Sequence, residues 1–347
     1  MAQEEDSDRG TCNLTVQGFE SGSCLVGSEG NQTNRACQVT LKWDGDVPLR
    51  LIKSAHLSRP EHYFSIYQSG CNFSCKKCHS WYFTRYASGD WMSPMDIAVL
   101  AQEYAKTVTY WEPRERATSF HAHDVCLSCG LCVTEHVRSP YCPGVLEPHQ
   151  VIPSPQGWGP ARNIIGFTGG DLACQPDFYC LAAEEIKRQS EDLWVLFETN
   201  GYGLTPENLN RFRGSGIDAF WLDIKAYDDG VHRKLTGCSN ERILQLPDEI
   251  RNRGFILEVL SLFIPGWVET DQIENIARIL AKVDPQIPFT ILAFFPEYQL
   301  QEVPPPNFEQ MMGAYERVKE TGLKHVRLGN IGIFVRKEHQ LKLLRSI

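Results

Sequence analysis

The pattern of hydrophobic and polar positions divides the chain into an irregular beginning and a longer region in which strands and helices alternate. Residues 1–60 predict an irregular or β-rich leader, within which 38–43 alternates apolar and polar residues as a strand does. Apolar runs typical of buried strands then recur at 62–68, 163–167, 193–197, 217–222, 255–260 and 289–293. Helical patterns occur at 94–105, 178–188, 206–212, 242–251, 271–282 and 308–321. Strands that alternate with helices predict parallel βαβ units.

Six such strands predict an α/β fold, a partial (β/α)6 TIM-like barrel that is open rather than closed by eight strands. The stretch 107–160 is rich in Cys, His and Pro and interrupts this rhythm, so we expect it to be an insertion. The chain is therefore predicted to consist of a leader (1–60), a barrel (61–106 and 161–335) interrupted by the insertion (107–160), and a C-terminal tail (336–347). Ligands bind such folds where loops leave the C-terminal ends of the strands.

Three cysteines, Cys71, Cys75 and Cys78, follow the first barrel strand with the spacing C-x3-C-x2-C. Three thiolates on one small loop can hold a cubane four-iron cluster and leave one iron without a protein ligand. An open position on a metal is where chemistry takes place, whereas a closed one is usually structural or transfers electrons. The alternatives are half of a zinc site or an incomplete ferredoxin motif, although zinc sites usually pair two C-x2-C knuckles.

A second group of cysteines lies in the predicted insertion. Cys126, Cys129 and Cys132 have the spacing C-x2-C-x2-C, and Cys142-Pro143 follows after nine residues. This run resembles a ferredoxin cluster-binding motif, in which three residues rather than nine precede the last cysteine. The alternatives for the fourth ligand are Cys174, Cys180 and a leader cysteine. A structural zinc site is another interpretation because three histidines are near in sequence, namely His121, His123 and His136.

Three further motifs follow successive barrel strands. Gly169, Gly170 and Asp171 come after the second strand, where paired glycines let backbone amides approach a ligand. Charged and polar residues follow the third and fourth strands: Glu198, Thr199, Asn200, Asp223 and Lys225. Each motif alone also fits a capping turn or a surface ion pair. Together with the cysteine loop, they indicate a site at the C-terminal edge of the sheet.

These cysteines and motifs resemble the radical S-adenosylmethionine (SAM) superfamily, and within it the glycyl-radical-enzyme activating enzymes, of which the activator of pyruvate formate-lyase is best known. The resemblance covers residues 61–335. It implies that the open iron is chelated by SAM and that the glycine-rich motif holds the SAM amino group. It further implies a cation or polar site for Glu198, Thr199 and Asp223, and a contact from Lys225 to the SAM carboxylate.

The resemblance implies an oxidoreductase that cleaves SAM reductively to a 5′-deoxyadenosyl radical, which then abstracts hydrogen from a substrate. A glycine of a partner glycyl-radical enzyme is the first choice of substrate, and a flavodoxin or ferredoxin is the expected electron donor. The implied cofactors are a catalytic [4Fe–4S] cluster, an auxiliary [4Fe–4S] cluster and SAM. The alternatives are an enzyme that modifies a small molecule or another protein, a non-catalytic iron–sulfur electron carrier, and a zinc-binding interaction module.

Composition and charge narrow the partners and the compartment. The chain has 347 residues and a net charge of −9 without a long basic block, which argues against a nucleic-acid partner. No apolar run approaches the roughly 20 residues that span a bilayer. Met1 to Gly10 is acidic and polar, unlike a signal peptide. We therefore expect a cytoplasmic protein with no membrane partner.

The cysteine count supports metal binding rather than a disulfide scaffold. The chain has 13 cysteines, and seven of them fall in the two groups described above. Cys12, Cys24 and Cys37 are separated by eleven and twelve residues, and this spacing by itself assigns no metal site.

Overall fold

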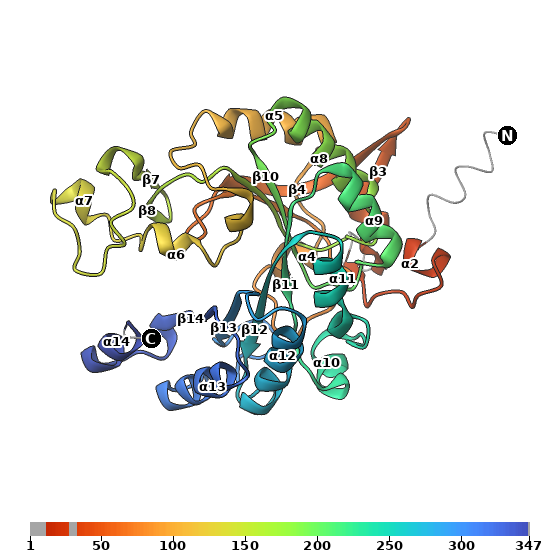
Figure 1. Cartoon of the computed structure of the whole chain (residues 1–347). Coiled ribbons are helices and arrows are strands. Elements are labelled where there is room, and N and C mark those ends of the chain that lie inside the picture. Colours follow the sequence, from red (N-terminus) through yellow and green to blue (C-terminus); the bar gives the residue numbers. More distant parts are fainter. Residues whose placement is uncertain (1–11, 28–32, 346–347) are drawn as a thin grey trace.

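One mixed sheet of ten strands forms the centre of the computed structural model, which describes residues 12–27 and 33–345 (Figure 1). The strand order is β14-β13-β12-β11-β10-β9-β5-β4-β3, and β6 pairs with β4. The strands from β5 to β14 in this order are parallel, whereas β3, β4 and β6 pair antiparallel. The predicted α/β class with a parallel sheet is confirmed, and the sheet is open because β14 and β3 are its two ends.

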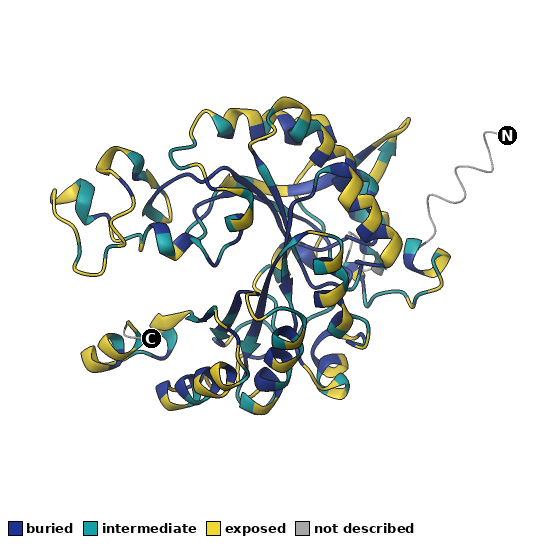
Figure 2. Ribbon diagram, in the orientation of Figure 1, coloured by how far each residue is buried: buried dark blue, intermediate teal, exposed yellow. Residues whose placement is uncertain are grey.

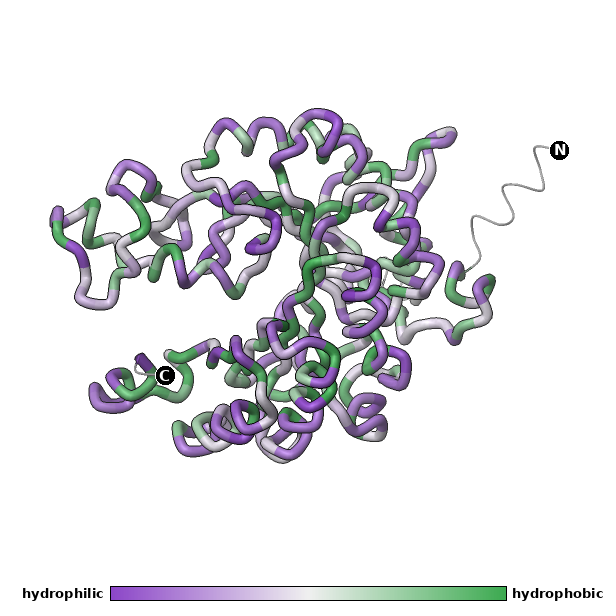
Figure 3. Tube along the Cα trace, in the orientation of Figure 1, coloured by the Kyte–Doolittle hydropathy of each residue, from purple (hydrophilic) through white to green (hydrophobic). Residues whose placement is uncertain are grey.

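The parallel strands agree with the predicted apolar runs to within a few residues. They are β5 (Phe64–Gln68), β9 (Ile164–Gly169), β10 (Trp194–Thr199), β11 (Ala219–Asp223), β12 (Ile256–Phe263), β13 (Phe289–Ala293) and β14 (Val326–Gly329). The hydropathy pattern did not indicate β14, which has four residues of which only Val326 is buried. The central strands are hydrophobic and buried, whereas the helices around them have exposed, hydrophilic outer faces (Figures 2 and 3).

Helices cover the outer face of the parallel strands. They are α5 (Pro94–Ala105), α8 (Asp177–Gln189), α9 (Pro206–Ser215), α10 (Asp229–Thr236), α11 (Leu246–Asn252), α12 (Thr270–Val283) and α13 (Phe308–Glu320). The predicted bounds of α5, 94–105, are confirmed. At its start, Ser93 Oγ accepts a hydrogen bond from Asp96 N at 3.1 Å, and Pro94 takes the first helical position. The predicted helix 242–251 is split, since the 3-10 turn Ile243–Gln245 precedes α11.

The leader contributes β3 and β4 to the ten-stranded sheet, and its β1 and β2 form a separate pair. Its elements are α2 (Asn13–Val16), β1 (Leu25–Gly27), β2 (Thr33–Arg35), α3 (Ala36–Thr40), β3 (Leu41–Asp44) and β4 (Val47–Leu57), and β6 (Asp90–Met92) pairs with β4. The sheet therefore begins before residue 61. The acidic segment Met1 to Gly10 lies outside the described residues.

The expected strand at 38–43 is wrong over its first half, where the chain is helical to Thr40. Local hydrogen bonds explain the difference. Arg35 N donates to Gln38 Oε1 at 3.1 Å, which caps the start of α3, and Thr40 Oγ1 donates to Ala36 O at 2.8 Å.

Residues 107–160 contain short elements with a small core of their own. The elements are α6 (Ala122–Val125), α7 (Leu131–Thr134), β7 (Ile152–Ser154), β8 (Gly157–Gly159) and the 3-10 turns Arg114–Arg116 and Pro148–Gln150. Val125, Leu146 and Val151 form their buried cluster. α14 (Glu338–Leu344) follows β14, the edge strand at the other end of the sheet from β3. Among the described residues, no helix has the length and apolar character that a membrane crossing requires.

A buried carboxyl group attaches this segment to the barrel. Glu258 in β12 is 1% exposed, and its Oε2 accepts a hydrogen bond from Phe120 N at 2.9 Å. Burial raises the pKa of Glu258 to about 8, although the backbone N–H groups of Phe120 and Ser119 act in the opposite direction. The native protein therefore holds a proton on Glu258 that the unfolded chain releases near pH 4.5.

We predict that Glu258→Gln removes a pH dependence of stability. Since the folded pKa is raised, the contribution of Glu258 is fully present below pH 4.5 and is lost as the pH rises toward 8, at a cost of roughly 5 kcal/mol. Glutamine keeps the acceptor oxygen but does not ionise. The stability of the variant minus that of wild type should be larger at pH 8 than at pH 5.5. Unfolding midpoints of both proteins, prepared anaerobically, measure this difference. An equal difference at both pH values would contradict the assignment.

Candidate functional site

The cysteine loop follows β5 at the end of the sheet where ligands of parallel α/β folds bind. β9, β10 and β11 are its successive neighbours in the sheet, so the motifs that follow these strands lie beside the loop. One cavity of about 330 Å³ lies at this edge, within the range of small-molecule sites. Its lining includes all but one of the predicted residues: Cys71, Cys75, Cys78, Gly169, Asp171, Glu198, Thr199, Asn200, Asp223 and Lys225.

The exception is Gly170, which packs against the cysteine loop and does not line the cavity. A Cβ atom on Gly170 would lie 1.9 Å from Gly70 O, and Gly170 N donates a hydrogen bond to Gln68 O at 2.8 Å. The backbones that follow β5 and β9 therefore approach so closely that only glycine fits. The paired glycines bring two loops together, in addition to any contact with a ligand.

Asp171 joins the loops around the cavity. Its Oδ2 accepts hydrogen bonds from Thr199 Oγ1 at 2.7 Å and Asn200 N at 2.9 Å, and its Oδ1 accepts one from Ala173 N at 2.8 Å. Its carbonyl oxygen accepts a fourth from Asn72 N at 2.8 Å. Burial raises the pKa of Asp171, and the hydrogen bonds oppose this shift. Asp171 thus lines the cavity while its carboxylate is bonded to protein donors.

Hydrogen-bond donors surround the thiol of Cys71. Phe73 N lies 3.5 Å and Asn200 Nδ2 lies 3.7 Å from its Sγ. Desolvation raises the pKa of Cys71 to about 12 and also raises that of Cys75, which Lys225 opposes. A metal must displace these protons to bind, and donors to the sulfurs of a cluster adjust its reduction potential.

Charged residues from β10 and the loop after β11 complete the lining. The Glu198 carboxylate accepts a hydrogen bond from Tyr63 Oη at 2.7 Å, and burial raises its pKa to about 7. Lys225 forms an ion pair with Asp223. Desolvation lowers the pKa of Lys225, but Asp223 together with Cys75 and Cys78 outweighs it, and the net shift is upward. Lys225 is therefore a positive charge near Cys75.

The sequence did not single out every residue that shapes the cavity. Ser65 and Tyr67 line it from β5, and the period of two residues in a strand could have indicated them. Lys77 pairs with Glu297 from the segment after β13, and its Nζ lies 3.6 Å from the centroid of the Phe295 ring. No local signal pairs these residues, which are more than 200 positions apart.

The second cysteine group surrounds a separate small cavity. Cys126, Cys129, Cys132 and Cys142 all line it, whereas His121, His123 and His136 do not. Ser128 and Gly130 have φ values of 58° and 71°, which turn the chain between the cysteines. A Cβ on Gly130 would lie 2.4 Å from the Trp158 ring. Cys142 is therefore placed with the other three cysteines despite its long spacing.

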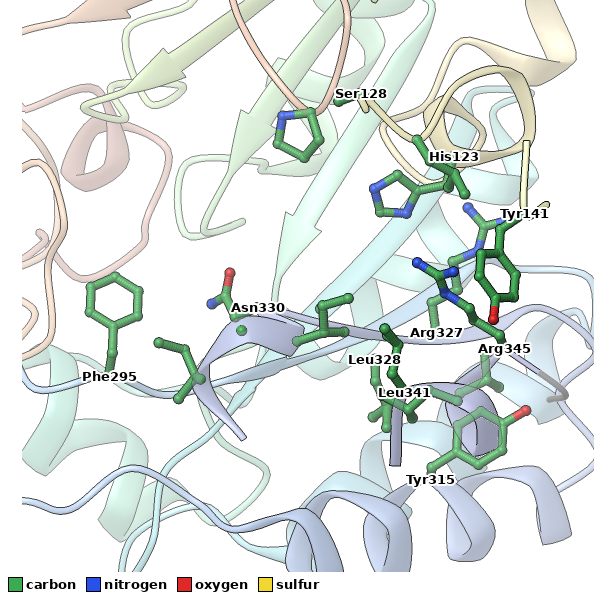
Figure 4. A pocket seen from close by; sticks show the side chains of 18 residues that line it. His123, Ser128, Tyr141, Phe295, Tyr315, Arg327, Leu328, Asn330, Leu341 and Arg345 are labelled. Atoms are coloured by element: carbon green, nitrogen blue, oxygen red, sulfur yellow. The ribbon is translucent and has the colours of Figure 1, made fainter. Parts of the chain in front are cut away.

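A larger cavity of about 930 Å³ lies between the segment 107–160 and the last elements of the chain, β14 and α14 (Figure 4). Its lining includes His123 and Tyr141 on one side and Arg327, Asn330 and Leu341 on the other. It also includes Phe295, which connects it to the first cavity through the contact with Lys77.

Within the described residues, no three His, Cys, Asp or Glu side chains converge on a position for a single metal ion. A cubane spreads its ligands over a wider volume than one ion does. The three thiols on one loop, which share a cavity with open space, are the donor set that fits an iron–sulfur cluster with one open iron.

Comparison with known proteins finds similarity over the part of the chain that contains β9 to β12. The radical SAM superfamily model matches residues 155–280. A protein of Methanocaldococcus jannaschii with the provisional name of a glycyl-radical enzyme activating enzyme is 29% identical over 168 residues, covering 47% of this chain and 60% of that protein. The pyruvate formate-lyase 1-activating enzyme of Escherichia coli (strain K12) is 25% identical over 175 residues, covering 46% of this chain and 70% of that enzyme.

Among solved structures, a domain of pyruvate-formate lyase-activating enzyme from Bacteroides vulgatus superposes with a TM-score of 0.41 at 20% identity, covering 48% of this chain and 98% of that chain. The match to the Methanocaldococcus jannaschii relative spans 60% of the length of that protein. Residues 155–280 of the chain thus match the radical SAM superfamily, and its relatives include proteins named as activating enzymes of glycyl-radical enzymes.

Proposed function

We propose that this protein is a radical SAM enzyme whose Cys71, Cys75 and Cys78 hold a [4Fe–4S] cluster beside bound SAM. One observation carries the proposal: the three thiols share a cavity with residues from the C-terminal ends of three neighbouring parallel strands. Cys71, Cys75 and Cys78 would hold the cluster, which when reduced would supply one electron to split SAM into methionine and a 5′-deoxyadenosyl radical. The residues of the chain bind and orient these groups.

Lys225 is the residue we assign to the SAM carboxylate. It lies in the cavity within electrostatic reach of Cys75, and Asp223 holds its ammonium group in place. A carboxylate near a positive side chain in a partly dry site gains a charge-assisted hydrogen bond. The cation or polar site proposed for Glu198, Thr199 and Asp223 lies around the same cavity. Gly169 lines the cavity too, and with Gly170 behind it we assign it to the SAM amino group.

A second [4Fe–4S] cluster is proposed on Cys126, Cys129, Cys132 and Cys142. The four thiols line one cavity, and four ligands leave no open iron. Its role would then be electron transfer or structure. Cys129 is exposed, so a flavodoxin or ferredoxin could approach this side of the molecule to deliver the electron.

The proposed substrate is a glycine Cα–H of a partner glycyl-radical enzyme. The names of the relatives support this choice, since they include activators of pyruvate formate-lyase and of isethionate sulfite-lyase. The larger cavity lies beside the first, because Phe295 belongs to its lining and its ring contacts Lys77, which lines the first cavity. A partner segment in this cavity would lie next to the cluster and SAM.

The substrate is tested with the reduced protein, SAM and a glycyl-radical enzyme from the same organism. A glycyl radical signal in electron paramagnetic resonance, formed together with 5′-deoxyadenosine, is expected. Turnover of a small molecule without any radical on the candidate partners would contradict the choice of substrate.

We predict that the two cysteine groups can be separated by mutation. Cys75→Ala should lose about four irons and all formation of 5′-deoxyadenosine, because it removes a ligand of the proposed catalytic cluster. Cys129→Ala should lose about four different irons and keep SAM binding. Iron content and chromatography of the products after reduction check both variants. Loss of both clusters in either variant would contradict two independent sites.

We predict that Lys225→Gln weakens SAM binding by about 10- to 100-fold, the value of one charge-assisted hydrogen bond. Iron content should be unchanged, since lysine is not a ligand. Lys234→Gln is the matched control, because Lys234 lies over the Trp267 ring, 4.4 Å from its centroid, and outside the cavity lining. Equilibrium titration of the reconstituted proteins with SAM measures the effect. Wild-type affinity in Lys225→Gln would contradict the assignment.

A further inference from the structure

Four cysteines outside the two groups come together where the leader packs against the loop after β9. They are Cys12, Cys24 and Cys37 of the leader and Cys174, which follows the glycine-rich motif after β9. They are widely separated in the sequence, so no spacing rule relates them. All four belong to or pack against the main hydrophobic cluster, and Cys24 and Cys174 are 8% and 6% exposed.

Hydrogen bonds bring these segments together in pairs. β1 pairs antiparallel with β2, and next to this pair Ala36 N donates a hydrogen bond to Cys24 O at 2.8 Å. Because Cys37 follows Ala36 directly, this bond brings Cys37 close to Cys24. Asn13 Nδ2 donates to Cys174 O at 2.9 Å, which brings the residue after Cys12 against Cys174. The chain therefore forms two pairs of cysteine-bearing segments, each joined by a hydrogen bond to a cysteine carbonyl: a backbone N–H donates in the first pair and the Asn13 side chain donates in the second.

The two pairs also lie within electrostatic reach of each other. The Cys174 thiol interacts with those of Cys37, Cys12 and Cys24, and the Cys37 thiol interacts with those of Cys24 and Cys12.

Two ordinary explanations fit this arrangement less well. Buried cysteines can act as small hydrophobic residues, as Cys180 does on α8, where the groups that act on its thiol include Ser215, Arg211 and Asp177. Disulfides could pair the four thiols, but all of them are free. Four thiols drawn from separate segments to one place match the ligand count of a closed metal site.

We propose that Cys12, Cys24, Cys37 and Cys174 hold a third metal centre, an iron–sulfur cluster with four thiolate ligands. Four thiolates are the ligand set of a closed [4Fe–4S] cluster, and a single zinc ion with the same four ligands is the alternative that the iron and zinc contents distinguish. With four protein ligands, the centre has no open iron and serves structure or electron transfer.

The location of this centre gives it a role near the catalytic loop. Cys174 is three residues beyond Asp171, whose carbonyl accepts a hydrogen bond from Asn72 N at 2.8 Å. The leader contacts the same loop, because Ser74 N donates to Ser23 Oγ at 2.9 Å and a Cβ on Gly22 would lie 2.2 Å from Asn72 O. The proposed centre thus fastens the leader against the loop that carries Cys71, Cys75 and Cys78.

The test compares metal content of the full-length chain after anaerobic reconstitution. The double variant Cys24→Ser/Cys37→Ser should bind about four fewer irons and sulfides per chain than wild type. Cys180→Ser is the matched control, a buried cysteine outside all three groups, and should keep the wild-type content. Cys75→Ala should lose a different set of about four irons, so the result does not depend on SAM chemistry.

Three outcomes would overturn the proposal. Unchanged iron in the double variant would show that the four thiols hold no cluster. Loss of one zinc in place of about four irons would replace the cluster with a single-ion site. Thiol titration of wild type that finds these cysteines in disulfides would exclude a metal altogether. If the double variant fails to fold, Cys37→Ser at a half-buried position provides the same measurement.

Discussion

The hydrogen bonds of the buried Asp171 side chain hold the candidate site together. Its carboxylate accepts donors from Thr199, Asn200 and Ala173, and its carbonyl accepts Asn72 N. These contacts fasten the loops after β5, β9 and β10 to one another at the edge where the strands end. Loss of the carboxylate would leave buried donors without partners, at about 1–3 kcal/mol each. The position of the cysteine loop therefore depends on a group that is not itself a metal ligand.

Close backbone packing supports the same arrangement. Gly170 lies so near Gly70 that a side chain cannot fit between the two loops. Lys77 and Glu297 attach the far end of the cysteine loop to the segment after β13. The loop is thus held on one side by backbone contacts and on the other by an ion pair, while the three thiols remain open to the cavity.

Features that depend on local sequence were predictable. The cysteine spacings, the cap at Ser93 and the apolar strands are local patterns, and parallel strand order explains why motifs after β9, β10 and β11 meet. Features that depend on distant contacts were not. The leader helix to Thr40 follows from side-chain caps that override the alternation of apolar residues. The gathering of Cys12, Cys24, Cys37 and Cys174, and the pairing of Lys77 with Glu297, require the folded chain. The four residues of β14 carry too little apolar signal to be recognised alone.

If Cys71, Cys75 and Cys78 hold a cluster with an open iron, SAM binds to that iron. Electron paramagnetic resonance of the reduced protein, recorded with and without SAM, detects this binding. We expect SAM to change the signal of one cluster in wild type and to leave the signals unchanged in a variant lacking Cys71. A reduced wild-type protein whose cluster signals are all unaffected by saturating SAM would contradict this expectation.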